Sequence, residues 1–484
     1  MESNNLFYLL VKAASEKPDM TFFYYGTSSI SYREVYDTSR RLANAFRKRG
    51  IECGDRILLS IGNIPAFLYA YFAALQLGVI VILVNPAARR YELRYYLEET
   101  EPKLAITESQ HIENYRVNDT FFIDPASIIT TDESAGSTDL MSLLAGEDPL
   151  TEIAAVDETH PTAIIFTSAM DGYALGAMIN HRAILETAKA SSALLVREHD
   201  TFLTALPLFH SFGLTSSLFI PLYNLVPFYL VRRFSPKRIL DTLNRYTITV
   251  FCGVPVMFQF LTQVMTEEMR FPNMRAWISG GESISTELQK SFRNTFDIEI
   301  RQGYGLTEAS PIVTWNLTGR KNKFGSIGLP MPYNEVQIQN NGEFAPSGVQ
   351  GEIVAKGVNV ITGYYKNKQK SKEYIVDGWL HTGDIGICDS EGYFYITNRK
   401  KNMIIKSGFN IYPKEIEKIL KNHPSVEEVN VTGHIESLDD ATKREHTEAT
   451  LYRKKGAPLS EDEFLNWCKS NISSYKIPDR IIIK

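Results

Sequence analysis

The segment most suggestive of chemistry is Gln302–Glu308, which reads Gln-Gly-Tyr-Gly-Leu-Thr-Glu. Glycines on both sides of an aromatic residue let the backbone approach a flat ligand closely, because they carry no Cβ atom. Thr307 and Glu308 then supply a hydroxyl group and a hard oxygen ligand, which suit phosphate and Mg²⁺. Taken alone, the segment could equally be a tight turn beside a strand, since short glycine motifs are common in turns.

Other motifs surround this segment along the chain. Three follow it: Gly378-Trp379-Leu380-His381-Thr382-Gly383-Asp384, Asn398-Arg399-Lys400-Lys401, and Ile405-Lys406-Ser407-Gly408-Phe409-Asn410-Ile411-Tyr412-Pro413-Lys414-Glu415-Ile416-Glu417. The others are Ser31-Tyr32-Arg33-Glu34, Gly54-Asp55-Arg56, Asn85-Pro86 with Glu92-Leu93, Leu206-Pro207-Leu208-Phe209-His210, Gly253-Val254-Pro255, Ser279-Gly280-Gly281-Glu282, Gly325-Ser326-Ile327-Gly328-Leu329-Pro330 and Gly351-Glu352-Ile353. In this order the motifs resemble those of the adenylate-forming superfamily of acyl- and aryl-CoA synthetases, luciferases and non-ribosomal peptide adenylation domains. The resemblance covers nearly the whole chain.

The resemblance implies a reaction in two steps. A carboxylate attacks the α-phosphate of Mg·ATP and gives an acyl-adenylate and pyrophosphate; the thiol of CoA then displaces AMP and gives a thioester. Neither step needs a covalent protein intermediate, so the protein positions the reactants and stabilises charge. ATP or AMP, CoA and Mg²⁺ are the implied cofactors, and a carboxylic acid and CoA are the implied partners. The small C-terminal domain of such enzymes rotates about a hinge between the two half-reactions.

The resemblance also implies a role for single residues in nucleotide binding. Tyr304 would stack on adenine, and Thr307 would contact the α-phosphate. Glu308 would bind Mg²⁺ as the metal ligand. Asp384 would accept from both ribose hydroxyls, as an acceptor-only carboxylate can, and Arg399 would reach the ribose from the far side. The full nucleotide set is Thr167, Ser168, Gly172, Gly176, Gly280, Gly281, Glu282, Tyr304, Gly305, Thr307, Asp384 and Arg399.

A second group of implied residues serves CoA and the acyl group. His210 would lie at the junction of the acyl and pantetheine pockets, with Phe209 and Gly303 beside it, and would act with Thr307 and Glu308 as a catalytic residue. Gly408 would border the narrow pantetheine tunnel, where only a residue without Cβ fits. Lys401 occupies the hinge position. For His210 a hydrogen-bonded histidine in the core is the alternative interpretation.

The chain departs from the family pattern in its phosphate loop. The family reads approximately Thr-Ser-Gly-Thr-Thr-Gly-x-Pro-Lys-Gly, whereas this chain reads Thr167-Ser168-Ala169-Met170-Asp171-Gly172-Tyr173-Ala174-Leu175-Gly176. Leu175 in place of lysine removes a charge-assisted contact worth ~1.5–3 kcal/mol. Asp171 adds a like charge near a polyphosphate. We therefore expect a loose hold on pyrophosphate, which suits its fast release or the reverse reaction toward ATP, while adenylate binding is untouched.

A second departure lies at the end of the chain. Family members carry a catalytic lysine a dozen or so residues beyond a Tyr-Lys-x-Pro stretch, which here is Tyr475-Lys476-Ile477-Pro478. The sequence ends at Lys484, too early for that lysine, and it ends within a β-rich run. The expectation is that the C-terminal domain is truncated; the alternative is that the protein lacks this lysine.

The motifs and their departures leave three functions open. The first is an AMP-forming acyl-CoA synthetase, which the intact motifs around Thr307, Asp384, Arg399 and Gly408 favour. The second is a catalytically impaired homologue that binds acyl, adenylate or CoA ligands, which the altered loop and the absent lysine favour. The third, an adenylation domain that loads a carrier protein, is disfavoured because no carrier domain is attached.

The apolar character of one segment bears on the substrate. The segment 207–231 is strongly apolar and includes Phe209, Phe212, Leu214, Phe219 and Leu222, which favours a fatty or aromatic acid over malonate or an amino acid. Many of these residues could instead be core. Cys252 lies in an apolar segment and is interpreted as a core residue, because a reactive thiol needs electropositive surroundings.

Composition excludes other classes of protein. The 484 residues are 44% hydrophobic and 22% charged, which is typical of a folded globular chain and not of a disordered or coiled-coil one. The net charge of −5 argues against a nucleic-acid binder. Four cysteines without CxxC spacing argue against a zinc site or a disulfide framework and suit a cytoplasmic location. Two charge-free runs, 57–88 and 201–231, are broken by proline, glycine and polar residues, so we expect buried strands and helices and no membrane span.

The elements that must position these motifs follow a strand–helix–strand pattern, which predicts a parallel sheet covered on both faces. We expect a large N-terminal domain (1–398) of doubly wound α/β layers with a β-rich subdomain, a hinge (399–402), and a small mobile α+β C-terminal domain (403–484). The expected strands are 55–60, 78–84, 163–167, 202–206, 246–252, 336–339, 352–355, 393–397, 403–405 and 426–433. The expected helices are 64–77, 181–195, 256–265, 413–422 and 460–470.

Overall fold

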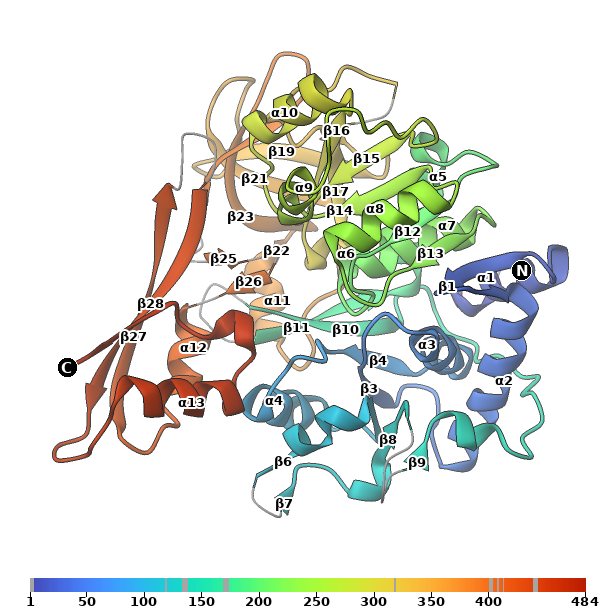
Figure 1. Cartoon of the computed structure of the whole chain (residues 1–484), viewed down its shortest axis with the longest axis horizontal. Helices are drawn as coiled ribbons and strands as arrows, with labels where there is room; N and C mark the ends of the chain where they lie inside the picture. The colour runs from blue at the N-terminus through green and yellow to red at the C-terminus, as the bar shows by residue number, and fades with distance from the viewer. Residues whose placement is uncertain are drawn as a thin grey trace.

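The computed structural model describes residues 4–117, 120–132, 138–168, 174–316, 319–399, 404–406, 409–411, 413–437 and 443–484. These residues form three large sheets with their helices, followed by a small α+β unit (Figure 1). The α/β class predicted from the strand–helix–strand pattern is thereby confirmed.

One sheet is built from the N-terminal third of the chain. Its strands β3, β4, β5, β8, β9 and β10 run parallel, and β11 closes it antiparallel to β10. Helix α3 (Pro65–Leu77) connects β3 to β4 and ends at Gly78, which has the left-handed backbone (φ 66°) typical of a helix C-terminus. The strand order is β11 (Ala174–Asn180), β10 (Pro161–Ser168), β4 (Ile80–Leu83), β3 (Arg56–Ser60), β5 (Leu104–Thr107), β8 (Ile128–Thr130) and β9 (Thr138–Asp139).

The second sheet is formed mainly by the middle of the chain. Its central strands are parallel, and antiparallel strands lie at both edges. The order is β18 (Leu329–Pro330), β17 (Ile312–Trp315), β16 (Ile300–Gly305), β15 (Ala276–Ser279), β14 (Val250–Gly253), β12 (Phe202–Thr204), β13 (Phe228–Leu230), β1 (Thr21–Tyr25) and β2 (Ser28–Ser31). The helices of these two layers are α1 (Phe7–Glu16), α2 (Tyr32–Lys48), α4 (Arg90–Thr100), α5 (His181–Leu195), α8 (Pro236–Arg245), α9 (Pro255–Thr262) and α10 (Thr286–Phe296).

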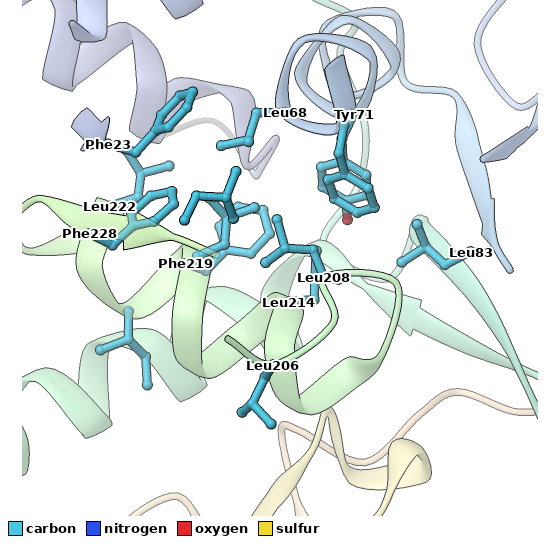
Figure 2. Packing of buried hydrophobic residues seen from close by; sticks show 14 of the residues in the cluster. Phe23, Leu68, Tyr71, Leu83, Leu206, Leu208, Leu214, Phe219, Leu222 and Phe228 are labelled. Carbon is cyan, nitrogen blue, oxygen red and sulfur yellow. The ribbon is translucent and has the colours of Figure 1, made fainter. Parts of the chain in front are cut away.

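The two sheets share one hydrophobic core (Figure 2). Helix α3 is apolar on all sides, as a helix buried between layers must be. Its aromatic residues contact Phe219 of a π turn (Thr215–Phe219), which lies between the short helices α6 (Ser211–Leu214) and α7 (Ile220–Tyr223). The rings of Tyr71 and Phe219 lie 6.1 Å apart, and Phe72 of α3 lies 6.2 Å from Phe22 of β1. This packing joins the two sheets into one body.

Both charge-free runs are accounted for by this core. Residues 57–88 fold as β3, α3 and β4, and residues 201–231 fold as β12, the α6–α7 segment and β13. The buried strand–helix–strand interpretation of these runs is therefore confirmed. Among the described residues, no helix combines the length and the apolar character that crossing a bilayer requires.

The third sheet is antiparallel and belongs to the glycine-rich part of the chain. It places Asp384 on β23 next to Arg399 on β24, because the two residues are paired in the register. Helix α11 (Lys368–Tyr374) packs beside it. Its strands are β20 (Glu343–Phe344), β19 (Asn334–Asn340), β21 (Gly351–Gly357), β23 (Trp379–Cys388), β22 (Ile375–Val376) and β24 (Phe394–Arg399).

The C-terminal unit has its own core. That cluster runs from Ile404 to Ile472, and Tyr91 of α4 packs against it. The unit contains the hairpin β25 (Ile404–Lys406) and β26 (Phe409–Ile411), helices α12 (Pro413–Leu420) and α13 (Glu461–Asn471), and a sheet of β27 (Val426–Ser437), β28 (Lys443–Arg453) and β29 (Arg480–Ile483). The hinge predicted at 399–402 stays a prediction, because residues 400–403 lie outside the described ranges.

Candidate active site

A cavity of about 650 Å³ lies where many strands of the two parallel sheets end. Ligands of open α/β sheets bind at the carboxyl ends of the strands, and the lining follows that rule. The loops after β3, β4 and β5 contribute to one wall, and the loops after β12, β14, β15 and β16 to the other. Thr382, Asp384, Ile396 and Arg399 of the third sheet complete the lining.

Asp384 and its two partners, Tyr304 and Arg399, form a polar part of the cavity lining. The Tyr304 hydroxyl donates to Asp384 Oδ2 at 2.6 Å, and Arg399 Nε lies 3.1 Å from Oδ1. Burial and the negative charge of Asp384 raise the pKa of the Tyr304 phenol well above 10, so the phenol remains a donor. The site thus presents an aromatic ring, a carboxylate and a guanidinium on one wall.

A second polar cluster surrounds Glu308. Its Oε1 accepts from the Thr167 hydroxyl at 2.8 Å and from the Tyr364 hydroxyl at 3.0 Å. Thr307 lies next to it, with its hydroxyl 3.2 Å from that of Ser211. The end of β10, where the predicted phosphate loop begins, is therefore held against the Thr307–Glu308 pair. The Glu308 carboxylate retains lone pairs for a further ligand.

His210 lies between two cavities. It lines the large cavity and also a smaller one of about 110 Å³, as do Phe209 and Thr307. Its Nδ1 accepts from the Phe212 amide at 3.4 Å. Burial lowers the pKa of the His210 imidazole to about 4, so the ring is neutral near pH 7. A neutral imidazole can accept a proton from a group that approaches through either cavity.

Most residues predicted for the site line the large cavity. These are Thr167, Phe209, His210, Gly280, Gly281, Glu282, Gly303, Tyr304, Gly305, Thr307, Glu308, Asp384 and Arg399. Ser168 ends strand β10. Gly172, Lys401 and Gly408 lie outside the described residues, so their predicted roles have no structural counterpart here.

Gly176 is not part of the cavity wall. It lies inside β11, opposite Phe166, where a Cβ atom would come within 2.7 Å of the Ile164 side chain. Glycine at this position is therefore explained by packing between the strand and its neighbours. The role predicted for Gly176 in nucleotide binding finds no support in this placement.

The glycines that flank Tyr304 differ in what they allow. A Cβ at Gly305 would lie 1.7 Å from the Pro311 carbonyl oxygen, so the protein's own backbone excludes a side chain there. A Cβ at Gly303 would meet its nearest atom at 3.6 Å, an ordinary contact. The sequence interpretation that both glycines permit close approach of a ligand is thus incomplete, because at Gly305 the approaching group is Pro311.

The cavity also has a largely apolar lining, which we call the apolar wall. It includes Cys252, whose thiol stays protonated because burial raises its pKa to about 12. Its other apolar members are Leu195, Ala205, Leu206, Phe209, Phe212, Ile220, Val254, Val256, Met257, Phe260, Ile278, Ile312 and Trp315. For Leu214, Phe219 and Leu222 the core alternative left open by the sequence holds, because these side chains are buried in the inter-sheet core (Figure 2).

Sequence reasoning missed two residues that shape the site, Asn63 and Tyr364. The Asn63 side chain donates to the carbonyls of Leu206 and Val231 and accepts from the Leu208 amide, so it ties the loop before His210 to the other sheet. A polar residue within an apolar run was the available signal for Asn63. Tyr364, the partner of Glu308, carried no such signal.

The fold and the cavity define an α/β enzyme that binds its ligand at the carboxyl ends of its strands. The family model described as AMP-binding enzyme matches residues 10–365, so the chain belongs to the AMP-binding enzyme family. This membership confirms the resemblance drawn from the motifs.

Named relatives match almost end to end. The long-chain-fatty-acid–CoA ligase of Bacillus subtilis (strain 168) is 28% identical, and the alignment covers 97% of this chain and 89% of the relative. The 2-succinylbenzoate–CoA ligase of Bacillus licheniformis is 30% identical, with 97% and 94% covered. One relative is named for a fatty acid and the other for an aromatic acid.

Solved structures extend the likeness to the arrangement of the whole chain. A double mutant of the o-succinylbenzoate CoA synthetase of Bacillus subtilis, bound to its product analogue, superposes with a TM-score of 0.86 at 27% identity and covers 100% of this chain and 95% of its own. The same synthetase in complex with AMP gives 0.73 at the same identity and coverage. The arrangement described here is closer to that of the product-analogue complex.

Proposed function

We propose that the protein is an AMP-forming acyl-CoA synthetase that activates an apolar carboxylic acid, fatty or aromatic. An acyl-adenylate forms first, and the CoA thiol then converts it to the thioester. The observation that carries the proposal is one cavity lined by Tyr304, Asp384 and Arg399, by the apolar wall and by His210, which also lines a second cavity.

The residues present fit a nucleotide. The Asp384 carboxylate can accept from two ribose hydroxyls, and the Arg399 guanidinium lies next to it. The Tyr304 hydroxyl donates to one oxygen of this carboxylate. Its aromatic ring provides the flat surface on which adenine would stack.

Glu308 and Thr307 fit the phosphate end of the reaction. Glu308 is a buried carboxylate in the cavity wall, and Mg²⁺ is commonly held by one or two carboxylates together with substrate phosphates. Bound Mg²⁺ would supply charge neutralisation for the attacked phosphate. The Thr307 hydroxyl would donate to the α-phosphate, and Thr167 and Tyr364 hold Glu308 in place.

His210 fits the thioester-forming step. Its ring is neutral, it faces both cavities, and its backbone loop is held by Asn63. A CoA thiol that enters through the smaller cavity would meet the adenylate carbonyl near His210. There the imidazole would orient the thiol and accept its proton.

The apolar wall supports an apolar acid, and relatives of the chain are named as ligases of both a fatty and an aromatic acid.

We propose a loose hold on pyrophosphate as a second property. Leu175, at the position of the family lysine, is buried in β11 opposite Thr167 and offers no cation to a phosphate.

We also propose that the chain divides into a large domain (1–398), a hinge (399–402) and a small C-terminal domain (403–484). The separate core of the C-terminal unit supports this division.

The test is turnover with a panel of acids. Decanoate, palmitate, benzoate, ferulate and malonate would each be incubated with ATP, Mg²⁺ and CoA, and AMP, pyrophosphate and thioester would be quantified together. We expect CoA-dependent thioester from at least one apolar acid and none from malonate. Pyrophosphate release with no acid in the panel would contradict the proposal and favour a catalytically impaired homologue.

The loose hold on pyrophosphate has a separate test. Isothermal titration with AMP, a non-hydrolysable acyl-AMP analogue and ATP compares the contribution of the β- and γ-phosphates with that of the adenylate. We expect AMP and the analogue to bind more tightly than ATP. Comparable affinities for AMP and ATP would contradict this part of the proposal.

A further inference from the structure

Two motifs have no role in the proposed chemistry, Glu92-Leu93 and Tyr475–Pro478, and they meet in a buried ion cluster. Lys476 Nζ lies 2.7 Å from Glu92 Oε1 on α4 of the large body and 2.6 Å from Glu415 Oε1 on α12 of the C-terminal unit. The side chains of Lys476, Glu92 and Glu415 are 5%, 1% and 11% exposed. One ammonium thus bridges carboxylates from the two parts of the chain.

Neighbouring contacts hold Glu92 in this position. The Ser473 amide donates to Glu92 Oε2 at 2.9 Å, and the Ser473 hydroxyl donates to the same oxygen at 2.5 Å. The Ser473 hydroxyl also lies 3.2 Å from the carbonyl oxygen of Ala87, which lines the main cavity. Tyr91 and Trp467 pack beside the cluster with ring centroids 5.7 Å apart. These contacts join α4 to the C-terminal unit along one seam.

The charges of the cluster depend on one another. Burial alone raises the pKa of the Glu92 carboxyl, but Lys476 and Ser473 outweigh it and hold that pKa below its ordinary value. Burial lowers the pKa of the Lys476 ammonium, but Glu415 and Glu92 outweigh it and raise that pKa well above 10.5. Glu92 and Lys476 are therefore both charged near pH 7. A buried charge that loses its partner is strongly destabilising, so the seam favours the one arrangement that completes the cluster.

The cluster also lies at one end of the smaller cavity. Glu92, Glu415, Tyr475 and Lys476 line that cavity together with His210, Phe209 and Thr307. The seam that Lys476 closes is thus part of the wall of the passage that leads to His210.

We propose that Lys476 is a positioning residue that, through Glu92, docks the C-terminal unit in the arrangement used for thioester formation. This inference rests on the proposed function. Glu415 and Lys476 belong to the same unit and stay together wherever it moves, whereas Glu92 joins them only in the docked arrangement. Loss of the Glu92 charge should therefore impair the second half-reaction and spare the first.

The test separates the two half-reactions in Glu92→Gln, which keeps an acceptor for Ser473 and removes only the charge. Adenylate formation is measured without CoA by trapping decanoyl-adenylate with hydroxylamine. Thioester formation is measured by mixing synthetic decanoyl-adenylate with CoA. We expect the second rate to fall about tenfold or more and the first to stay within about twofold. Glu98→Gln on the same helix is the control, because the Glu98 ion pair with Arg94 is exposed.

A second variant and a readout without substrate complete the design. Lys476→Met should slow thioester formation at least as much, and adding Glu92→Gln to it should cause little further loss, since both act through one pair. Hydrogen exchange of the full chain should quicken in α4 and α13 of Glu92→Gln and remain unchanged in the Glu98→Gln control.

The outcomes are distinct. Equal slowing of both half-reactions, or no change in either, would overturn the positioning role of Lys476. Unchanged exchange of α4 and α13 in Glu92→Gln would overturn the docking. If the proposed function is wrong, the unmodified protein will form neither adenylate nor thioester. Hydrogen exchange in Glu92→Gln would still decide whether Glu92 docks the C-terminal unit.

Discussion

Among single residues, Asp384 allows the most direct test of the proposed nucleotide site. Its carboxylate contacts both Tyr304 and Arg399. We expect Asp384→Asn to raise the Kd for AMP about tenfold or more, because a hydrogen bond to a charged group contributes about 1.5–3 kcal/mol. Isothermal titration with AMP measures this change.

The matched control is Asp389→Asn. Asp389 follows β23 and pairs with Lys323 at 2.7 Å away from the cavity. This substitution should leave the Kd for AMP unchanged. An equal loss of affinity in both variants would show that the Asp384 substitution acts through the fold and not through contact with the ribose.

The buried His181 should make the free energy of unfolding depend on pH. It is buried, its Nδ1 accepts from the Leu6 amide at 3.0 Å, and burial lowers its pKa from 6.5 to about 3. The unfolded chain therefore binds a proton on His181 below pH 6.5, whereas the folded chain binds it only near pH 3. As the pH falls from 6.5 toward 3, the free energy of unfolding therefore decreases. From pH 7 to pH 5 the loss should be about 2 kcal/mol.

Denaturant unfolding of the native protein and of His181→Asn at the two pH values measures this loss. The Asn side-chain oxygen can accept from Leu6 but does not titrate, so the variant should lose about 2 kcal/mol less than the native protein between pH 7 and pH 5. An identical pH dependence in the two proteins would contradict the assignment to His181.

At the scale of elements, strand β16 offers a pair of matched substitutions. Gly305→Ala would place a Cβ 1.7 Å from the Pro311 oxygen, so it should cost about 1–3 kcal/mol of stability or more. Gly303→Ala meets only an ordinary contact and should fold, but it adds a methyl group to the cavity wall and should weaken ligand binding. Thermal unfolding together with AMP and acyl-AMP titration separates the two effects. Equal stability of both variants would contradict the packing account of Gly305.

At the scale of the whole molecule, the C-terminal unit should change position with the ligand. The described arrangement superposes better on a relative with its product analogue than on the same relative with AMP. We expect the small-angle scattering of the ligand-free protein to fit this arrangement and to change when ATP and Mg²⁺ are added. Scattering that is identical with and without ATP would contradict the expected rotation.

The sequence predicted much of the fold because its local signals agreed with the tertiary environment. The helix predicted at 181–195 is α5 with the same bounds, and the strand–helix–strand predicted at 55–84 is β3, α3 and β4. Buried parallel strands are continuous apolar runs, so they are visible without neighbours. Strand β28 was not predicted, because it is polar and is defined by pairing with β27.

The residues of the candidate site were likewise only partly predictable from the sequence. Tyr304, Thr307, Glu308 and Asp384 could be named from their motifs, since each chemical group lies within a short run of the chain. The motifs did not reveal that Leu214, Phe219 and Leu222 are core, because an apolar residue facing a substrate and one facing a helix look alike in sequence.

By itself, the amino-acid sequence determined the family, the α/β class and which side chains could take part in the chemistry, because these depend on residue type and on spacing over short distances. Only the tertiary structure decided which groups meet. Glu92 and Lys476 lie in distant parts of the chain, and their burial together depends on how the C-terminal unit packs against α4. Such a contact has no local signature, since the free energy that maintains it comes from desolvation and charge pairing between separate elements.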